Sequence, residues 1–269
     1  MIDEVPTFAE LHVPGKPFML VNAWDVMSAL AFADAGHPAI GTTSLGITAA
    51  AGLLDGAREG RNLTVCLARA LGGRFSAHLS VDLEDGYTDD PAAVADLVAQ
   101  LAQYGVAGVN IEDANRSTAI HAAIIADVKS SNPQVFVNAR TDVFWSGSGD
   151  PDEALARLRA YRDAGADGLF VPGLNDRAVV AEVVAIGPPV NVLFQQGDNF
   201  ASEGIARIST GSALYRHSLV TAIETAAAAR EGIAPSGQAV TYAWTQRLLA
   251  ASGSADNDSM DTMSDYRQP

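Results

Sequence analysis

Apolar runs of strand length alternate with helical stretches along the chain, and this alternation limits the fold more than any other feature. Strand-like segments occur at 18–23, 39–44, 76–84, 108–113, 134–142, 168–173, 189–194 and 206–211. Alanine-rich amphipathic stretches separate them, among them 25–36, 91–104, 152–164 and 213–230. Strands that alternate with helices at this spacing form a parallel sheet. Eight such units favour closure into a (β/α)8 barrel, a TIM barrel, over the alternative of an open doubly wound sheet.

The chain has the length of one such barrel, and no linker divides it. Its 269 residues include two helical stretches that begin with Asp-Pro, at 90–91 and 150–151, and end at glycine. A further helix is expected at 237–252, so the single domain spans residues 1–252 and has one helix more than a barrel needs. The polar residues 253–269 show no apolar periodicity, and we expect them to be disordered.

Composition excludes several classes of partner. A net charge of −15 argues against binding to nucleic acid or to an anionic membrane. No run of apolar residues is long enough to span a bilayer, and the acidic start does not resemble a signal peptide. Cys66 is the only cysteine, so no intrachain disulfide can form; we expect it in the core and the protein in the reducing cytoplasm.

Charged residues interrupt the apolar runs at the carboxyl ends of three consecutive strand segments. Charges are costly to bury unless they are paired or bind a metal. The active site of a (β/α)8 barrel lies at the carboxyl ends of its strands. The pattern therefore predicts a functional site at this end of the barrel. The charged pairs are Asp82 and Glu84, Glu112 and Asp113, and Arg140 and Asp142.

Three of these carboxylates are candidates for a metal site. Asp82 and Glu84 are two residues apart on one strand, so they should point the same way, and Glu112 follows on the next strand. Converging carboxylates raise one another's pKa, and a divalent cation relieves the repulsion. Ligands that are all oxygen suit Mg2+ first and Mn2+ second. The alternative is that some of these acids cap helices, as Asp85 and Asp113 could.

Arg140 lies within an apolar strand, with Asn138 on the same face. A buried arginine usually binds a carboxylate or a phosphate through its fork of donors. An internal salt bridge to Asp142 or Glu112 is the alternative, and both interpretations can hold together. The small residues of 41–56 could bring backbone N–H groups to a substrate oxyanion, although an ordinary loop is an equally good interpretation.

Five segments in order resemble the isocitrate lyase/phosphoenolpyruvate mutase superfamily. They read NAWDVMSALAFADAGHPAIGTTSLGITAAAGLLDG, SVDLEDGYTDDP, GVAGVNIEDA, VNARTDVF and YRDAGADGLFVPG. Each segment alone is loose, and their order makes the resemblance specific. It extends from about Pro14 to about Thr225. The resemblance implies a Mg2+-stabilised enolate of pyruvate or of a related 2-oxo or 2-hydroxy acid, beside which a carbon–carbon or carbon–phosphorus bond is made or broken.

The resemblance also implies functions for single residues. In the superfamily the metal is often held through water, and the residues that match its ligands here are Asp82, Glu84 and Glu112. Asp55 matches a loop aspartate near metal and substrate, and with Arg140 and Glu112 it forms the expected catalytic set. The backbone of Thr43, Ser44 and Leu45 matches the part that binds the substrate's carboxylate and enolate oxygen. The remaining residues of the expected substrate-binding set are Trp24, Asp25, Asn138 and Arg140.

The chain departs from the superfamily where the reaction is decided. The lyases carry Lys-x-Cys-Gly-His after the Glu-Asp pair, where this chain reads EDANRSTAIHAAI. The mutases carry Glu-Asp-Lys, and in this chain Ala114 replaces the lysine. A second departure is on the metal-binding strand, where Glu84 replaces the usual aspartate. We therefore expect a Mg2+-dependent lyase or decarboxylase acting on a small 2-oxo or 2-hydroxy carboxylate, with an acid other than the loop cysteine.

Two alternatives remain. One is carbon–phosphorus chemistry on a phosphonate, as a hydrolase or a mutase, and the other is a barrel that binds a ligand without turnover. In the superfamily the last helices pack on a neighbouring subunit. The helix at 237–252 is therefore expected to be exchanged or docked in a homodimer or homotetramer.

Overall fold

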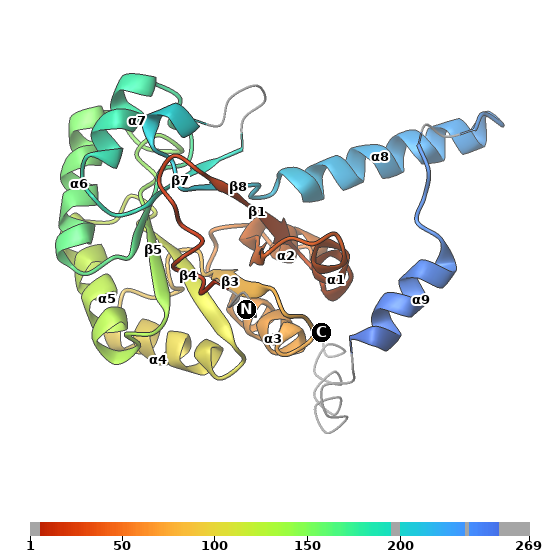
Figure 1. Cartoon of the computed structure of the whole chain (residues 1–269), viewed down its shortest axis with the longest axis horizontal. Coiled ribbons are helices and arrows are strands. Elements are labelled where there is room, and N and C mark those ends of the chain that lie inside the picture. Colours follow the sequence, from red (N-terminus) through yellow and green to blue (C-terminus); the bar gives the residue numbers. More distant parts are fainter. Residues whose placement is uncertain (1–5, 195–199, 235–236, 253–269) are drawn as a thin grey trace, which may run out of the picture.

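The computed structural model describes residues 6–194, 200–234 and 237–252, and the tail predicted to be disordered lies outside them. Within these residues eight parallel strands close into one barrel in the order of the sequence (Figure 1). This confirms the predicted (β/α)8 barrel over an open sheet. The strands are β1 (Phe18–Ala23), β2 (Ala39–Thr42), β3 (His78–Asp82), β4 (Val106–Glu112), β5 (Phe136–Arg140), β6 (Gly168–Phe170), β7 (Val190–Leu193) and β8 (Arg207–Ser209).

Most of the helices cover the outside of the barrel, and two of them begin at the predicted caps. Asp90 and Asp150 accept backbone N–H groups two residues on, at 3.1 and 3.0 Å. A cap of this kind stabilises a helix by about 1 kcal/mol. The helices are α1 (Val26–Asp34), α2 (Ser44–Ala50), α3 (Arg61–Leu71), α4 (Pro91–Ala102), α5 (Thr118–Ser131), α6 (Pro151–Asp163), α7 (Arg177–Val184), α8 (Ala213–Arg230) and α9 (Tyr242–Ala251).

The main core lies between the barrel and its helices. Val81, Val109 and Val137 are neighbours across β3, β4 and β5, and they belong to one apolar cluster with buried helix residues such as Leu97 and Leu158. Each fully buried side chain of this size contributes about 1.5–3 kcal/mol. This layer holds the strands, and hence their carboxyl ends, in fixed positions.

The middle of the barrel interior is polar. The Nδ2 of Asn138 donates to the Oδ1 of Asn110 at 2.8 Å, and the Nη2 of Arg207 donates to the same oxygen at 3.0 Å. Arg207 is fully buried and forms no ion pair within the described part of the chain. Burial lowers the pKa of Arg207 to about 9, against the opposing charge of Asp82. The positively charged guanidinium of Arg207 therefore lies inside the barrel, below the carboxyl ends of the strands.

The N-terminal segment covers the opposite end of the barrel. Phe8 packs edge-on against Phe136, with ring centroids 5.5 Å apart, and His12 stacks on Phe136 at 4.2 Å. A Cβ at Gly108 would lie 2.5 Å from the Phe8 ring, so only glycine leaves room for this ring. With this end covered, the carboxyl ends of the strands are the end available for a site.

The last two helices differ in how they contact the barrel. None of the residues of α8 is buried, and the helix projects away from the barrel (Figure 1). Helix α9 confirms the helix predicted at 237–252 and packs on α1 of the same chain, where Trp244 Nε1 donates to Asp34 Oδ2 at 3.2 Å. Its docking on another subunit stays a prediction.

Two further observations concern the chain as a whole. Cys66 is exposed on α3, so its predicted place in the core is wrong. It faces away from the buried side of α3, which carries Thr64, Ala68 and Leu71. Within the described residues no helix combines the length and the hydropathy needed to cross a bilayer.

Candidate active site

The candidate site lies at the carboxyl ends of β3, β4 and β5. These strands end at Asp82, Glu112 and Arg140, which confirms that charged residues stand at neighbouring strand ends. Glu112 pairs with Arg140 across the sheet, and Asp82 pairs with Asn110, two residues before Glu112. Side chains two residues apart on a strand share a face. The three charged side chains therefore project into the same end of the barrel.

Glu84 lies beyond β3, so the prediction that it shares a strand face with Asp82 is wrong. Its φ of +50° is left-handed, because the chain turns here toward α4. Glu84 is only 2% exposed, and neither carboxylate oxygen accepts a hydrogen bond of ordinary geometry within the described residues, although the backbone N–H group of Arg58 lies near enough to oppose the rise in its pKa. Burial raises the pKa of Glu84 to about 7, and the charges of Asp55 and Asp82 act in the same direction.

Arg140 binds two internal carboxylates. Its Nη1 lies 2.8 Å from Oε2 of Glu112, and its Nε donates to Oδ1 of Asp142 at 2.6 Å. The guanidinium also lies over the ring of Phe170, 5.6 Å from its centroid. Both internal salt bridges considered in the sequence analysis therefore form. The Nη2 group makes no hydrogen bond within the described residues, and substrate binding by Arg140 stays a prediction.

Negative charge exceeds positive charge at this site. Burial raises the pKa of Glu112 above its usual range, and the charges of Asp142, Asp82 and Asp55 add to this effect while Arg140 opposes it. Burial also raises the pKa of Asp82, although the Arg140 charge and the Ser44 N–H group oppose it. Several carboxylates thus compete for one guanidinium.

This donor set fits a hard divalent cation. The side chains offer only oxygen, and both oxygens of the buried Glu84 lack a partner. No group of three or more His, Cys, Asp or Glu side chains within the described residues is arranged to hold an ion by itself. Mg2+ commonly keeps several waters and takes one or two protein carboxylates. Asp82, Glu84 and Glu112 would therefore hold such an ion mainly through water.

The segment interpreted as a small-residue loop is partly helical, because Ser44 begins α2. Thr43 is its N-cap residue and makes no side-chain cap hydrogen bond. The N–H group of Ser44 donates to Oδ2 of Asp82 at 3.2 Å, and Leu45 is half-buried in the first turn. Of the three backbone donors expected for a substrate oxygen, that of Ser44 thus orients a candidate metal ligand and that of Thr43 donates to the Ala23 carbonyl at 3.1 Å, and substrate binding by this segment stays a prediction.

Asp55 lies on the exposed loop 51–60 between α2 and α3. It lies close enough to the site for its charge to raise the pKa of Asp82, of Glu84 and of Glu112. The structure therefore brings together Asp55, Asp82, Glu84, Glu112 and Arg140.

Three other candidates have structural partners. Asn138 lies one layer below Arg140, where it is buried and donates to Asn110. The carboxylate of Asp25 caps α1 by accepting the N–H group of Ser28 at 2.7 Å. Trp24 is half-buried and packs edge-on against Tyr215, with ring centroids 5.5 Å apart. Substrate binding by these residues stays a prediction.

The interpretation of Asp85 and Asp113 as helix caps is wrong, because α4 is capped by Asp90 and α5 by Ser117. Asp113 is fully buried, and its Oδ2 accepts hydrogen bonds from Thr141 Oγ1 and Tyr161 OH, both at 2.8 Å. It therefore ties β4 to β5 and α6. Sequence reasoning missed these contacts, and the only signal was the position of both acids next to the predicted metal ligands.

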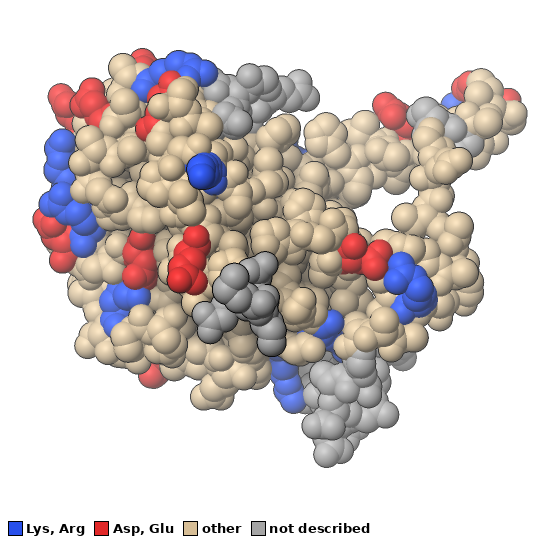
Figure 2. Space-filling model, in the orientation of Figure 1, with Lys and Arg blue, Asp and Glu red and all other residues tan. Residues whose placement is uncertain are grey.

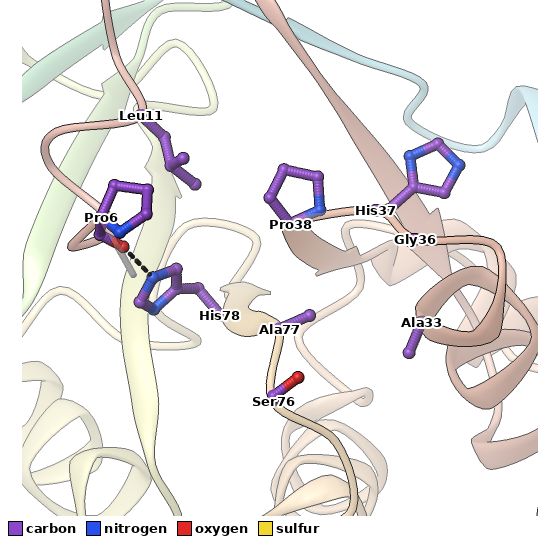
Figure 3. A pocket seen from close by; sticks show the side chains of 9 residues that line it. All are labelled: Pro6, Leu11, Ala33, Gly36, His37, Pro38, Ser76, Ala77 and His78. Carbon is purple, nitrogen blue, oxygen red and sulfur yellow. Dashed lines mark hydrogen bonds between the residues drawn. The ribbon is translucent and has the colours of Figure 1, made fainter. Parts of the chain in front are cut away.

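A cavity of about 220 Å³ lies at the other end of the barrel (Figure 3). It is lined by the N-terminal segment and by the residues that precede β2 and β3. His78 Nε2 lies 2.8 Å from the carbonyl oxygen of Pro6 on one side of it, and His37 lies on the other. The active sites of barrel enzymes lie at the carboxyl ends of the strands. This cavity is therefore separate from the candidate active site.

Known proteins resemble this chain over most of its length. Residues 8–230 match the family model described as phosphoenolpyruvate phosphomutase. An uncharacterized protein of Mycobacterium tuberculosis is 45% identical over 235 residues, which cover 84% of this chain and 90% of that protein. A solved structure from Burkholderia cenocepacia, provisionally assigned as a phosphonomutase, is 36% identical; the match has a TM-score of 0.75 and covers 80% of this chain and 96% of that one.

Two solved structures of lower identity share the fold. A 2,3-dimethylmalate lyase is 24% identical, with a TM-score of 0.74 and 94% of each chain covered. A phosphonopyruvate hydrolase in complex with oxalate and Mg2+ is 18% identical, with a TM-score of 0.73, and the match covers 88% of this chain and 91% of that one. Because the family match spans residues 8–230, this chain belongs to the phosphoenolpyruvate phosphomutase family, within the isocitrate lyase/phosphoenolpyruvate mutase superfamily.

Proposed function

We propose that this protein is a Mg2+-dependent lyase that cleaves or decarboxylates a small 2-oxo or 2-hydroxy carboxylate through an enolate. The observation that carries the proposal is the buried carboxylate of Glu84, unpartnered at the carboxyl end of the barrel beside Asp82 and Asp55. A divalent cation relieves such repulsion. The shared fold with a 2,3-dimethylmalate lyase supports carbon–carbon bond cleavage as the reaction class.

Different residues of the protein would bind the metal ion and the substrate. Asp82, Glu84 and Glu112 would hold the ion, which when bound supplies a Lewis acid for the developing enolate charge. Arg140 would bind the substrate carboxylate through Nη2. Its contacts with Asp142 and Glu112 fix the guanidinium in one orientation before the substrate arrives.

The proton donor must differ from that of the lyases with a loop cysteine. The segment between β4 and α5, residues 113–117, reads DANRS and contains no thiol. We propose that water protonates the leaving enolate.

Carbon–phosphorus chemistry is the second candidate. It is favoured by the description of the matching family model and by the 36% identity to the Burkholderia cenocepacia structure. A barrel that binds a carboxylate without turnover is the third.

One set of assays separates these functions. The purified protein with Mg2+ is given oxaloacetate, 2-methylisocitrate, 2,3-dimethylmalate or phosphonopyruvate, and oxalate binding is measured in parallel. Turnover of a carbon–carbon substrate alone is the expected result. Turnover of phosphonopyruvate would establish the second candidate. Oxalate binding without turnover of any substrate would favour the third.

We further propose that the protein acts in the cytoplasm as a homodimer or homotetramer, without a nucleic-acid or membrane partner. Helix α8 supports the assembly, because it exposes Leu219, Val220 and Ile223. Figure 2 shows mostly uncharged surface along this helix.

A further inference from the structure

Left-handed backbone is concentrated around the candidate site. Six non-glycine residues of the described chain have positive φ, and all but one lie in three loops at the carboxyl ends of the strands. Side chains disfavour this conformation, which persists only where the surrounding contacts hold it. Contacts must therefore fix the loops 51–60, 83–90 and 113–117. The five residues are Arg58 (+62°), Glu84 (+50°), Tyr87 (+64°), Ala114 (+43°) and Asn115 (+59°).

One carboxylate joins the three loops. From the first loop, the Nε of Arg58 donates to Oδ2 of Asp85 at 2.7 Å. From the third loop, the Nη2 of Arg116 lies 2.7 Å from the same oxygen and donates to the carbonyl of Asp85 at 2.6 Å. We refer to Arg58, Asp85 and Arg116 together as the clasp.

The two halves of the clasp differ in burial. The side chains of Asp85 and Arg116 are 10% and 8% exposed, and Arg157 Nη1 donates to the Arg116 carbonyl at 2.8 Å. The Arg58 side chain is 39% exposed, and its second partner is the exposed Asp89, 2.6 Å from Nη2. Exposed ion pairs are weaker than buried ones because water screens them. The Arg58 half is therefore the one that can open while the Arg116 half stays in place.

The loop held by Arg58 covers Glu84. A Cβ added at Gly60, the last residue of the loop, would lie 2.8 Å from Oε1 of Glu84 and equally close to Thr48. On the α3 side, Tyr87 hydrogen-bonds Thr64 at 3.0 Å. These contacts explain why a carboxylate without a hydrogen-bond partner is almost fully buried. With the loop closed, solvent has little access to Glu84.

We propose that Arg58 and Arg116 are positioning residues that act through Asp85: they hold the loop 51–60 closed over Glu84, and release of Arg58 opens the route by which a divalent cation enters and leaves. The route rests on the proposed function, whereas loop closure does not. Arg116 lies in the segment where the lyases carry their cysteine loop. In this chain that segment is a fixed support, and the loop 51–60 is the part that opens.

Hydrogen exchange of the full chain tests loop closure. In Arg58→Ala we expect the backbone amides of 51–60 to exchange roughly 3- to 30-fold faster than in the wild type, the range for losing one charge-assisted contact. Asp89 also lies 3.4 Å from Nη1 of Arg116, and Asp89→Ala should give a smaller increase because it leaves the contacts of both arginines with Asp85 in place. Arg61→Ala is the matched control: Arg61 is exposed and forms no ion pair within the described residues, so exchange should not change. Equal exchange in wild type and Arg58→Ala would refute the proposal that the clasp holds the loop 51–60 closed.

Release of Mn2+ to an excess of chelator tests the route. Arg58→Ala should release Mn2+ faster by about the same factor as its amides exchange, and Arg58→Lys should recover part of the difference, since an ammonium cannot span both Asp85 and Asp89. Faster amide exchange with unchanged Mn2+ release would refute the route and leave the closed loop. If the wild type binds no Mn2+, the proposed route and the metal-dependent function are both refuted. Amide exchange then still tests whether the clasp holds the loop closed.

Discussion

Replacing Arg140 by lysine separates the contribution of this arginine to folding stability from its proposed contribution to substrate binding. The guanidinium contacts Glu112 at 2.8 Å and Asp142 at 2.6 Å, and one ammonium cannot reproduce both contacts. Losing one charge-assisted hydrogen bond costs about 1.5–3 kcal/mol of folding free energy. In a chain of this size that corresponds to a fall in Tm of roughly 3–12 °C. If Nη2 also binds a substrate carboxylate, oxalate affinity should fall about 30-fold or more, equivalent to roughly 2–5 kcal/mol.

The assay pairs the Tm with the oxalate dissociation constant, both measured in the presence of Mg2+. Oxalate is the probe because it resembles the enolate of pyruvate. Arg159→Lys is the control, since Arg159 is exposed on α6 and forms no ion pair within the described residues. A lower Tm with unchanged oxalate affinity would refute substrate binding by Arg140. It would also favour a barrel without turnover.

Three further predictions concern the metal site and the assembly. Asp82→Ala should abolish or strongly weaken Mn2+ binding in calorimetry without unfolding the protein, and equal binding would remove Asp82 from the site. The pKa of Glu84 is about 7 in the folded protein against 4.5 for an ordinary glutamate, so the metal-free protein should lose stability as the pH rises from 4.5 through 7, by about 1–3 kcal/mol once solvent screening is included. Glu84→Gln should reduce this dependence in Tm values measured between pH 4.5 and 8, the remainder belonging to Glu112 and Asp82, and an unchanged profile would contradict it. Light scattering at micromolar concentration should give a multiple of 28.0 kDa, and the mass of one chain would refute the assembly.

The barrel could be predicted because its signals are local. Apolar runs, and the Asp-Pro pairs at 90–91 and 150–151, define the strands and helix starts without reference to distant residues. The same patterns place charged residues at the carboxyl ends of the strands, although the strands end at Asp82, Glu112 and Arg140, one or two residues before the predicted ends. The place of Glu84 could not be predicted, since it depends on a left-handed turn and on Gly60 of another loop.

The contacts of the missed residues are also distant in sequence. Asp85 meets Arg58 across 27 residues and Arg116 across 31, while Arg207 reaches Asn110 across 97. A pattern read in a short window carries no record of such pairs. Their only local sign is a charged residue within or beside an apolar run, and that sign does not name the partner.

The closed order of the strands has a consequence for synthesis of the chain. β1 pairs with β8 on one side, so the first strand to leave the ribosome keeps an unpaired edge until the last one follows. The backbone N–H of Gly15 likewise awaits the carbonyl of Ile205, 3.1 Å away in the finished barrel. At about 5–20 residues per second the interval lasts roughly 10–40 s. During that time the unpaired N–H and C=O groups at the edge of β1 are open to pairing with another chain, and a chaperone that covers the nascent N-terminal half would raise the yield of closed barrels.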